Sequence, residues 1–249
     1  MDMISNLPDD IIIFCILPLV TTKEAVATSI LSKRWTNLCH FVPKIDFTNI
    51  SVNSYESNSS FNKFVYSVLS SGDAVFPHFI DSFSLDIKYG NPNLAYLGFP
   101  NIFEWINHVV QRRVEYLRLH LHVDNLDHDH DDDEDQPKFP ISTLTCKTLV
   151  TLKLSGFHLE SFSVSSIGFG FPLLRTLHLR YIEFTDIQDF MLFLAGCPFL
   201  ENLRLSDIFF PEEEEDSVTI QEVKSFILPK LTIANITFLV FIFSDESTL

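Results

Sequence analysis

A short motif, in which an apolar residue is followed three positions later by Leu-x-Leu, recurs along the chain and constrains the fold most. Its central leucines from Leu117 onward are separated by 35, 25, 26 and 28 residues. A repeat of about this length is typical of stacked strand-and-helix units, which bury a shared core only by packing on their neighbours. The clear copies are Val114–Leu119, Leu149–Leu154, Leu174–Leu179 and Leu200–Leu205, and weaker copies are Ile80–Leu85 and Leu228–Ile233.

The segments between these motifs change from a strand period of two to a helical period of 3.6. We therefore predict an α/β fold, in which short parallel strands alternate with helices along a solenoid. One predicted helix ends at Gly196, a residue typical of helix ends. The apolar positions that carry the helical period are Phe61, Phe64, Val65, Val68 and Leu69, then Phe103, Ile106, Val109 and Val110, then Ile187, Phe190, Met191 and Leu194.

The first 47 residues differ from the repeats and predict three short helices. Pro8 suits a first helical turn, whereas Pro18 should end or kink the first helix near Leu17. Thr21 and Glu24 have the spacing of a capping box that begins the second helix. Val26, Ile30 and Leu31 are expected to face inward from that helix, and Trp35 anchors a third helix over Ser32–Leu38. Three such helices bury too little surface to be stable alone.

Two stretches of sequence resemble the plant F-box/leucine-rich-repeat family. One is Ile4-Ser-Asn-Leu7-Pro8-Asp-Asp-Ile11-Ile12 with the later segment Thr22–Trp35, which is similar to an F-box. The other is Leu194-Ala-Gly-Cys197-Pro-Phe-Leu200-Glu-Asn-Leu203, which is similar to the repeats of that family. The resemblance implies an F-box over residues 1–47 and a leucine-rich-repeat solenoid over 48–235. A small helical cap on the following domain is the alternative for the first segment.

The resemblance also implies a function without catalysis by this chain. An F-box binds the Skp-family adaptor and, through it, the cullin of an SCF-type cullin–RING ubiquitin ligase, while the repeats hold a client protein. The alternatives are an interaction scaffold outside the ligase, and a degenerate short form without a client site. The residues that the resemblance places at the adaptor are Leu7, Pro8, Ile11, Ile16, Leu17, Val26, Leu31, Lys33, Arg34 and Trp35.

Charge is concentrated in two segments of this acidic chain, whose net charge is −16. Residues 124–135 hold eight acids and residues 212–216 hold five; without these thirteen, 20 acids stand against 17 bases. We interpret them as acidic insertions at 124–138 and 211–217, on one edge of the solenoid. Nucleic-acid binding is not expected, because it needs clustered positive charge. His128 and His130 lie in the first insertion and are interpreted as part of a solvated loop rather than a metal site.

One basic position recurs between the two leucines of the motif. Strand alternation places it on the exposed, concave face, where it either aids solubility or binds a client that is acidic or phosphorylated. We predict that the copies stack in register and form a ladder of basic side chains. Its members are Arg118, Lys153, His178 and Arg204.

The remaining features predict an intracellular protein that acts by binding. We find none of the motifs of a phosphate loop, a nucleophile elbow or a zinc protease, so neither an enzyme nor a cofactor is expected. Four widely separated cysteines are interpreted as reduced core thiols, and no segment is long and apolar enough for a bilayer. A cytoplasmic or nuclear location follows. The last segment, 236–249, is interpreted as an atypical apolar tail that lacks the polar cap of a solenoid.

Overall fold

The computed structural model describes residues 6–70, 80–124, 137–160, 170–210 and 227–241. The chain divides into two compact units, with the boundary inside one strand, so that Leu119–Leu121 belong to the second unit. The first unit contains the N-terminal helices, two complete strands and two long helices. The second contains four complete strands and one helix of nine residues.

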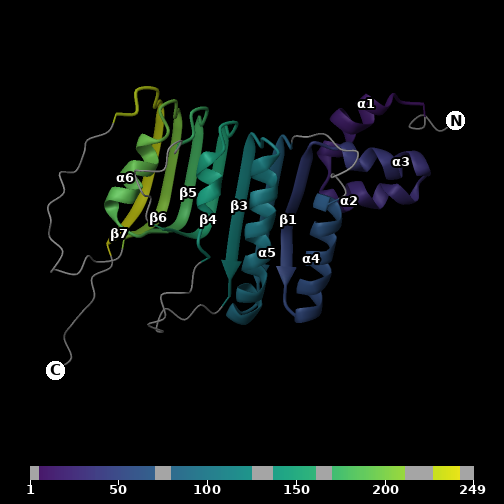
Figure 1. The fold of residues 1–249 in the computed structure, drawn as a ribbon, viewed down its shortest axis with the longest axis horizontal. Coiled ribbons are helices and arrows are strands. Elements are labelled where there is room, and N and C mark those ends of the chain that lie inside the picture. The colour runs from purple at the N-terminus through teal and green to yellow at the C-terminus, as the bar shows by residue number, and fades with distance from the viewer. Residues whose placement is uncertain (1–5, 71–79, 125–136, 161–169, 211–226, 242–249) are drawn as a thin grey trace. The chain divides into compact units, whose positions relative to one another are not determined.

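Within each unit, neighbouring strands pair in parallel and follow the order of the chain, as expected for stacked repeats (Figure 1). The predicted α/β fold class is therefore confirmed. The strands are β1 (Lys44–Val52), β2 (Ser82–Tyr89), β3 (Tyr116–Val123), β4 (Thr151–Leu159), β5 (Thr176–Phe184), β6 (Asn202–Phe210) and β7 (Ile233–Phe241). The two long helices are α4 (Tyr55–Ser70) and α5 (Pro92–Gln111), the shorter helix is α6 (Ile187–Ala195), and a 3₁₀-helix covers Ile141–Thr145.

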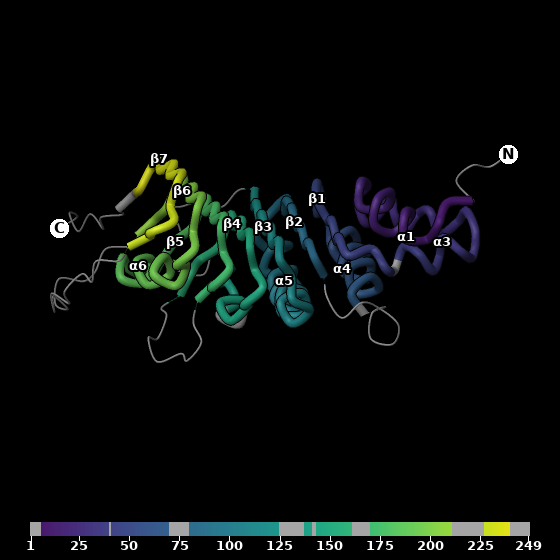
Figure 2. Tube along the Cα trace, turned by 90° about the horizontal axis from the view of Figure 1, so that it is seen from above, coloured from purple at the N-terminus to yellow at the C-terminus, as the bar shows by residue number. Residues whose placement is uncertain are grey.

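The apolar residues of neighbouring strands stack in register and form the core. In the second unit Leu152 pairs with Leu177, and Leu177 pairs with Leu203; all three are buried. The helices cover the face to which these side chains point, as Figure 2 shows for α4 and α5 in the first unit and for α6 in the second. Aromatic rings fill the space between the layers: Phe47 contacts Phe61 and Phe64, and Phe184 contacts Phe190 and Phe193.

Each repeat motif found in the sequence overlaps the start of a strand. The three segments with a helical period form the helices α4, α5 and α6. Strand β1 was not predicted, because Ile45 and Phe47 occupy the positions that leucines hold elsewhere. They pair with Phe83 and Leu85 of β2, so they belong to the same stacked rows. At the other end, β7 includes six residues of the segment interpreted as a tail, and its side chains from Ile233 to Leu239 are exposed.

The N-terminal helical module, residues 6–41, follows the predicted order of three helices. Pro18 has the predicted effect: the first helix passes through a π-helical stretch, Ile12–Ile16, and ends in the 3₁₀ turn Leu17–Leu19. The capping box of Thr21 and Glu24 is present. The helices are α1 (Asp9–Ile11), α2 (Thr22–Ala27) and α3 (Lys33–Leu38), and 3₁₀ turns cover Thr28–Ile30 and Cys39–Phe41.

The prediction that Ile30 and Leu31 face inward is wrong. Ile30 is 87% exposed and Leu31 64%. The reason is the early end of α2 at Ala27: a 3₁₀ turn follows, which has three residues per turn, so the side chains rotate off the apolar stripe of an α-helix. The prediction for the cysteines is confirmed for Cys146 and Cys197, which are buried free thiols, whereas Cys15 is exposed.

A left-handed residue interrupts most strands at an equivalent position. These residues are Gly156 in β4, Tyr181 in β5 and Asp207 in β6, with φ values of 78°, 49° and 55°. Each directly follows one member of a row of paired residues, Ser155, Arg180 and Ser206 respectively. Asn49 of β1 and Phe238 of β7 share this conformation. Only glycine adopts it without strain. At Gly156 a second constraint applies, because a Cβ there would lie 2.3 Å from the carbonyl oxygen of Leu121.

We expect Gly156→Ala to lower the free energy of unfolding by about 2 kcal/mol or more, because the methyl group adds a backbone clash to the left-handed strain. Chemical denaturation measures the change. Tyr181→Gly is the matched comparison: it relieves the same strain in β5 and loses the contact of the Tyr181 ring with Arg180, so its net effect should stay below about 1 kcal/mol. Equal losses in the two variants would contradict the close-contact explanation.

Candidate functional site

The helical module has a small core of its own. Leu17 and Trp35, both predicted to face an adaptor, are only 2% and 8% exposed and lie in this core. Leu7 and Ile16 are partly buried against it. A substitution such as Trp35→Ala would therefore act first on the folding of the module, and the contact of these residues with an adaptor stays a prediction. The core residues are Ile12, Ile13, Leu17, Ala25, Trp35 and Leu38.

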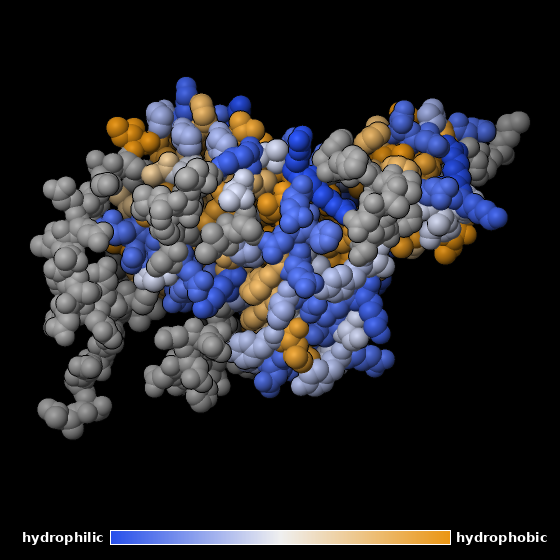
Figure 3. Space-filling view, viewed as in Figure 1, coloured by the Kyte–Doolittle hydropathy of each residue, from blue (hydrophilic) through white to orange (hydrophobic). Residues whose placement is uncertain are grey.

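Large apolar side chains nevertheless remain at the surface of this module. Of the predicted set, Ile11 and Leu31 are exposed, Pro8 is exposed and Val26 is half-buried. The sequence reasoning missed Phe14, Leu19 and Ile30, which are 60%, 81% and 87% exposed. In Figure 3 apolar residues are visible among the polar ones over the N-terminal helices. Exposed apolar side chains on so small a unit are typical of a protein-binding surface.

The two basic residues predicted to flank the adaptor contact differ in their surroundings. Lys33 is exposed at the start of α3. Arg34 instead holds the module together, because its guanidinium donates to the carboxylate of Asp9 and to the carbonyl oxygen of Leu7. These contacts tie α1 to α3. Arg34 therefore already has partners within the chain.

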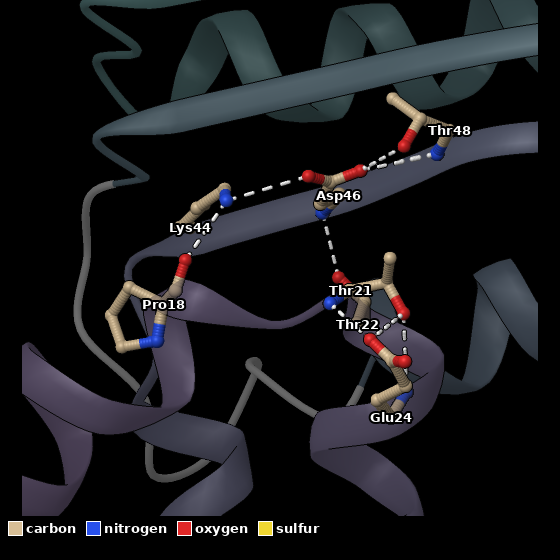
Figure 4. Close-up of polar contacts among 7 residues, drawn as sticks. All are labelled: Pro18, Thr21, Thr22, Glu24, Lys44, Asp46 and Thr48. Atoms are coloured by element: carbon tan, nitrogen blue, oxygen red, sulfur yellow. Dashed lines mark hydrogen bonds and ion pairs between the residues drawn. The ribbon is translucent and has the colours of Figure 1, made fainter.

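The module is joined to the first strand by direct hydrogen bonds rather than by a free linker (Figure 4). The backbone N–H of Asp46 in β1 donates to Oγ1 of Thr22 at 2.7 Å, and Lys44 Nζ donates to the carbonyl oxygen of Pro18 at 2.8 Å. Lys44 also lies 3.4 Å from the Asp46 carboxylate, which accepts a hydrogen bond from Thr48 Oγ1. Thr22 is buried and begins α2, so the capped end of that helix is fixed on β1.

The second candidate site is the basic row on the open face of the second unit. The register prediction is confirmed for three of its members: Lys153 pairs with His178, and His178 pairs with Arg204. Their leucine neighbours point to the helices, so the three side chains lie on the opposite face of the sheet. Arg118 belongs to the first unit, where its guanidinium lies 3.0 Å from the Asp86 carboxylate. Client binding by any of the four stays a prediction.

His178 has an unusual environment. It is half-buried, and its pKa is lowered to about 4, first by burial and then by the positive charges of Lys153 and Arg204. Its Nε2 atom is buried and has no hydrogen-bond partner among the residues that the structure describes. The imidazole is therefore neutral at pH 7, between two cations.

The family of the chain follows from a comparison of its sequence with known protein families. Residues 102–230, just over half of the chain, match the family described as "FBD-associated F-box protein At5g56370, LRR repeats". The chain belongs to this family of F-box proteins with leucine-rich repeats. The predicted resemblance is thereby confirmed.

Three relatives from Arabidopsis thaliana illustrate how far this family likeness extends. F-box/FBD/LRR-repeat protein At1g78750 is 35% identical over 90% of this chain and 46% of its own length. F-box/LRR-repeat protein 13 is 33% identical over 90% of this chain and 45% of its own length. F-box/LRR-repeat protein At4g14103 is 35% identical over 90% of this chain and 54% of its own length. The chain thus spans about half the length of the curated relatives it matches. No solved structure matches the chain.

Several predictions fall outside the described residues. The acidic segments 125–135 and 212–216, with His128 and His130, belong to this group, so their placement on one edge stays a prediction. Within the described ranges, no group of three or more His, Cys, Asp or Glu side chains could hold a metal ion. A search of the same ranges finds no helix with the length and apolar character needed to cross a membrane.

We expect Thr22→Val to destabilise the chain by about 1–3 kcal/mol, because the variant leaves the backbone N–H of Asp46 without its acceptor. Hydrogen exchange at the Asp46 amide should accelerate as well. Thr48→Val is the matched control. It removes the hydrogen bond that the Thr48 hydroxyl donates to the Asp46 carboxylate, but that carboxylate keeps its ion pair with Lys44. Unchanged exchange at Asp46 in Thr22→Val would contradict a junction held by this bond.

We expect His178 to reduce the stability of the folded chain as the pH falls. Below its ordinary pKa of 6.5 the unfolded chain binds a proton at His178, whereas the folded chain binds it only near its lowered pKa of about 4. The free energy of unfolding should therefore decrease between these two values, and less so in His178→Asn. Denaturation curves across this pH range provide the measurement, with His108→Asn at an exposed position of α5 as control. Parallel curves for wild type and His178→Asn would refute this assignment.

Proposed function

We propose that this F-box/LRR-repeat chain is a client-recruiting subunit of an SCF-type cullin–RING ubiquitin ligase. Its helical module binds a Skp-family adaptor, through which it reaches the cullin, and its repeats bind a client protein. The observation that carries this proposal is the exposure of Phe14, Leu19, Ile30 and Leu31 on a helical module with little core of its own. Family membership supports it, because the matched relatives are F-box proteins by name.

The contacts at Thr22 and Lys44 support a role in positioning. They attach the helical module to β1 without an intervening flexible segment. A client held on the first repeats would therefore keep a set orientation to a bound adaptor. The chain would supply proximity, and the chemistry would belong to its partners. A cytoplasmic or nuclear location is part of this proposal.

Adaptor binding can be tested with the purified chain and purified adaptor. Leu31→Lys should weaken binding by about ten-fold or more, because a buried leucine contributes about 1.5–3 kcal/mol and the new charge would be desolvated. Folding should be unaffected, since Leu31 is 64% exposed. Leu173→Lys is the matched control: Leu173 is 52% exposed and belongs to the other unit, so this variant should bind like wild type.

Each outcome of this titration separates the alternatives. Equal affinities of wild type and Leu31→Lys would exclude Leu31 from the contact. Failure of the wild-type chain to bind the adaptor would overturn the proposed function. If the adaptor binds but cullin does not co-purify with the pair from cells, the chain is an interaction scaffold outside the ligase.

A further inference from the structure

Strand β7 has one free edge within the part of the chain that the structure describes. Its other edge pairs with β6 along its length (Figure 1). The N–H of Ile233 donates to the carbonyl oxygen of Glu201, so the backbone of Ile233 faces β6. Backbone groups alternate in direction along a strand of a parallel pair, and those of Ala234 and Ile236 therefore face the free edge. Such a row of N–H and C=O groups is a template for another strand.

The buried apolar rows of the second unit continue onto β7 but lose their cover there. Ile236 pairs with Leu205, and Leu239 pairs with Ile208, so both residues extend rows that are buried in β6. Leu205 and Ile208 are 2% and 0% exposed, whereas Ile236 is 53% and Leu239 43% exposed. One further strand with apolar side chains at these positions would bury both residues.

This edge lacks the features that normally keep exposed strands from pairing. Edge strands commonly carry charged side chains, proline or an irregular backbone. Strand β7 contains no charged residue and no proline. Its left-handed residue, Phe238, is no barrier, because Tyr181 has the same conformation in β5 and that strand pairs on both edges. The edge can therefore accept a strand, and an apolar strand suits it best.

The second edge of β1, in the first unit, is already occupied. Strand β1 pairs with β2 on one side, and on the other side the N–H of Asp46 donates to Oγ1 of Thr22 in α2. Lys44 is held by the carbonyl oxygen of Pro18. A second copy of the chain therefore cannot add its β1 to β7 in the head-to-tail manner that builds open filaments. Within the described residues, β7 of the second copy is the strand that remains.

We propose that β7 binds β7 of a second copy of this chain, in antiparallel orientation across a two-fold axis perpendicular to the sheet. This axis keeps the helix-covered faces of the two sheets on the same side. Ile236 of each copy then lies beside Leu239 of the other, so the ends of the apolar rows are buried together. Such a contact is self-complementary, and β7 carries no charge that would oppose an identical partner or select a different one. The inference is independent of the proposed ligase role.

The first test measures the mass of the purified chain by sedimentation, at concentrations from about 1 μM to about 1 mM. The mass should rise from 28.6 kDa towards twice that value and no further. A weak dimer is expected, because one edge strand offers less than the about 800 Å² that each partner of a standard interface buries. A chain that stays monomeric at the highest concentration overturns the proposal, and so does growth beyond a dimer, which would need a second free edge.

A charged substitution tests whether β7 forms the contact. Ile236→Lys should weaken self-association by about ten-fold or more, because the contact would desolvate the new charge. Its folding should be unaffected, since Ile236 is already half-exposed. Leu173→Lys is the matched control: Leu173 is 52% exposed and lies in the same unit but outside β7, so this variant should dimerise like wild type. Equal losses in the two variants would reduce the effect to net charge and overturn the site.

A mixture of two variants tests the antiparallel orientation. Ile236→Lys and Leu239→Glu should each dimerise poorly alone. A one-to-one mixture should form a heterodimer, because the opposite charges meet at one of the two symmetry-related contacts and the other contact stays apolar. A mixture that associates no better than its components would overturn the proposed pairing.

Hydrogen exchange shows whether the backbones pair. The amides of Ala234 and Ile236 should exchange at least about ten-fold more slowly in the dimer than in the monomer, whereas the amide of Ile233, bonded to β6, should change little. Ala234→Pro removes an N–H from the free edge and leaves the ladder with β6 intact, so it should also weaken the dimer. Exchange that is independent of concentration would overturn the pairing. Protection that requires an added extended apolar peptide would assign the edge to a strand of another protein and overturn the second copy.

Salt separates this contact from an association driven by charge. Each copy has a net charge of −16, so the two copies repel each other and added sodium chloride should strengthen the dimer. Association that weakens with salt would indicate a charged contact elsewhere and overturn the assignment to β7.

Adaptor binding distinguishes failure of this inference from failure of the proposed function. Ile236→Lys should bind the adaptor like wild type, and this result with a weakened dimer supports both. If wild type binds the adaptor but stays monomeric, the dimer is wrong and the ligase role stands. If wild type dimerises but does not bind the adaptor, the ligase role is wrong and the dimer stands.

Discussion

The parallel pairing of strands in register is the constraint on which the rest of the structure depends. Because Leu152, Leu177 and Leu203 lie side by side, one row of apolar side chains is buried against the helices. Strand alternation then places the residues between those leucines on the opposite face. The row of Lys153, His178 and Arg204 is thus a direct consequence of burying the leucines. The lowered pKa of His178 follows in turn from burial and from this fixed spacing.

The helical module is stabilised in a different way from the repeats, because it has only a small apolar core. Its core is small, and its stability depends on internal contacts, such as those of Arg34 with Asp9 and Leu7, and on its attachment to β1 through Thr22. The cost of this arrangement is a set of large apolar side chains in contact with water, including Leu19 and Ile30. Burial of these side chains against a partner would be favourable, since the full burial of one large apolar side chain stabilises a complex by about 1.5–3 kcal/mol.

Much of this organisation could be predicted from sequence because it depends on periodicity. The leucine spacing predicted β3 to β6, and the helical period predicted α4 to α6. Predictions failed where geometry depends on tertiary context. A 3₁₀ turn after Ala27 places the side chains of Ile30 and Leu31 at the surface. Strand β1 was not predicted because Ile45 and Phe47 replace the leucines of the motif. The hydrogen bond from Asp46 to Thr22, like the pairing of Arg118 with Asp86, joins residues whose proximity no local pattern encodes.

The left-handed residue within the strands has an evolutionary consequence. Gly156, Tyr181 and Asp207 place the same left-handed conformation at the same point of three successive repeats, so each repeat carries this local geometry within itself. A whole repeat can then be duplicated or deleted without disturbing the register of its neighbours, and connections between strands can lengthen freely. An insertion of one residue inside a strand would instead turn its leucines to the open face. Variation in chain length among related proteins should therefore come in units of one repeat or be confined to the connections.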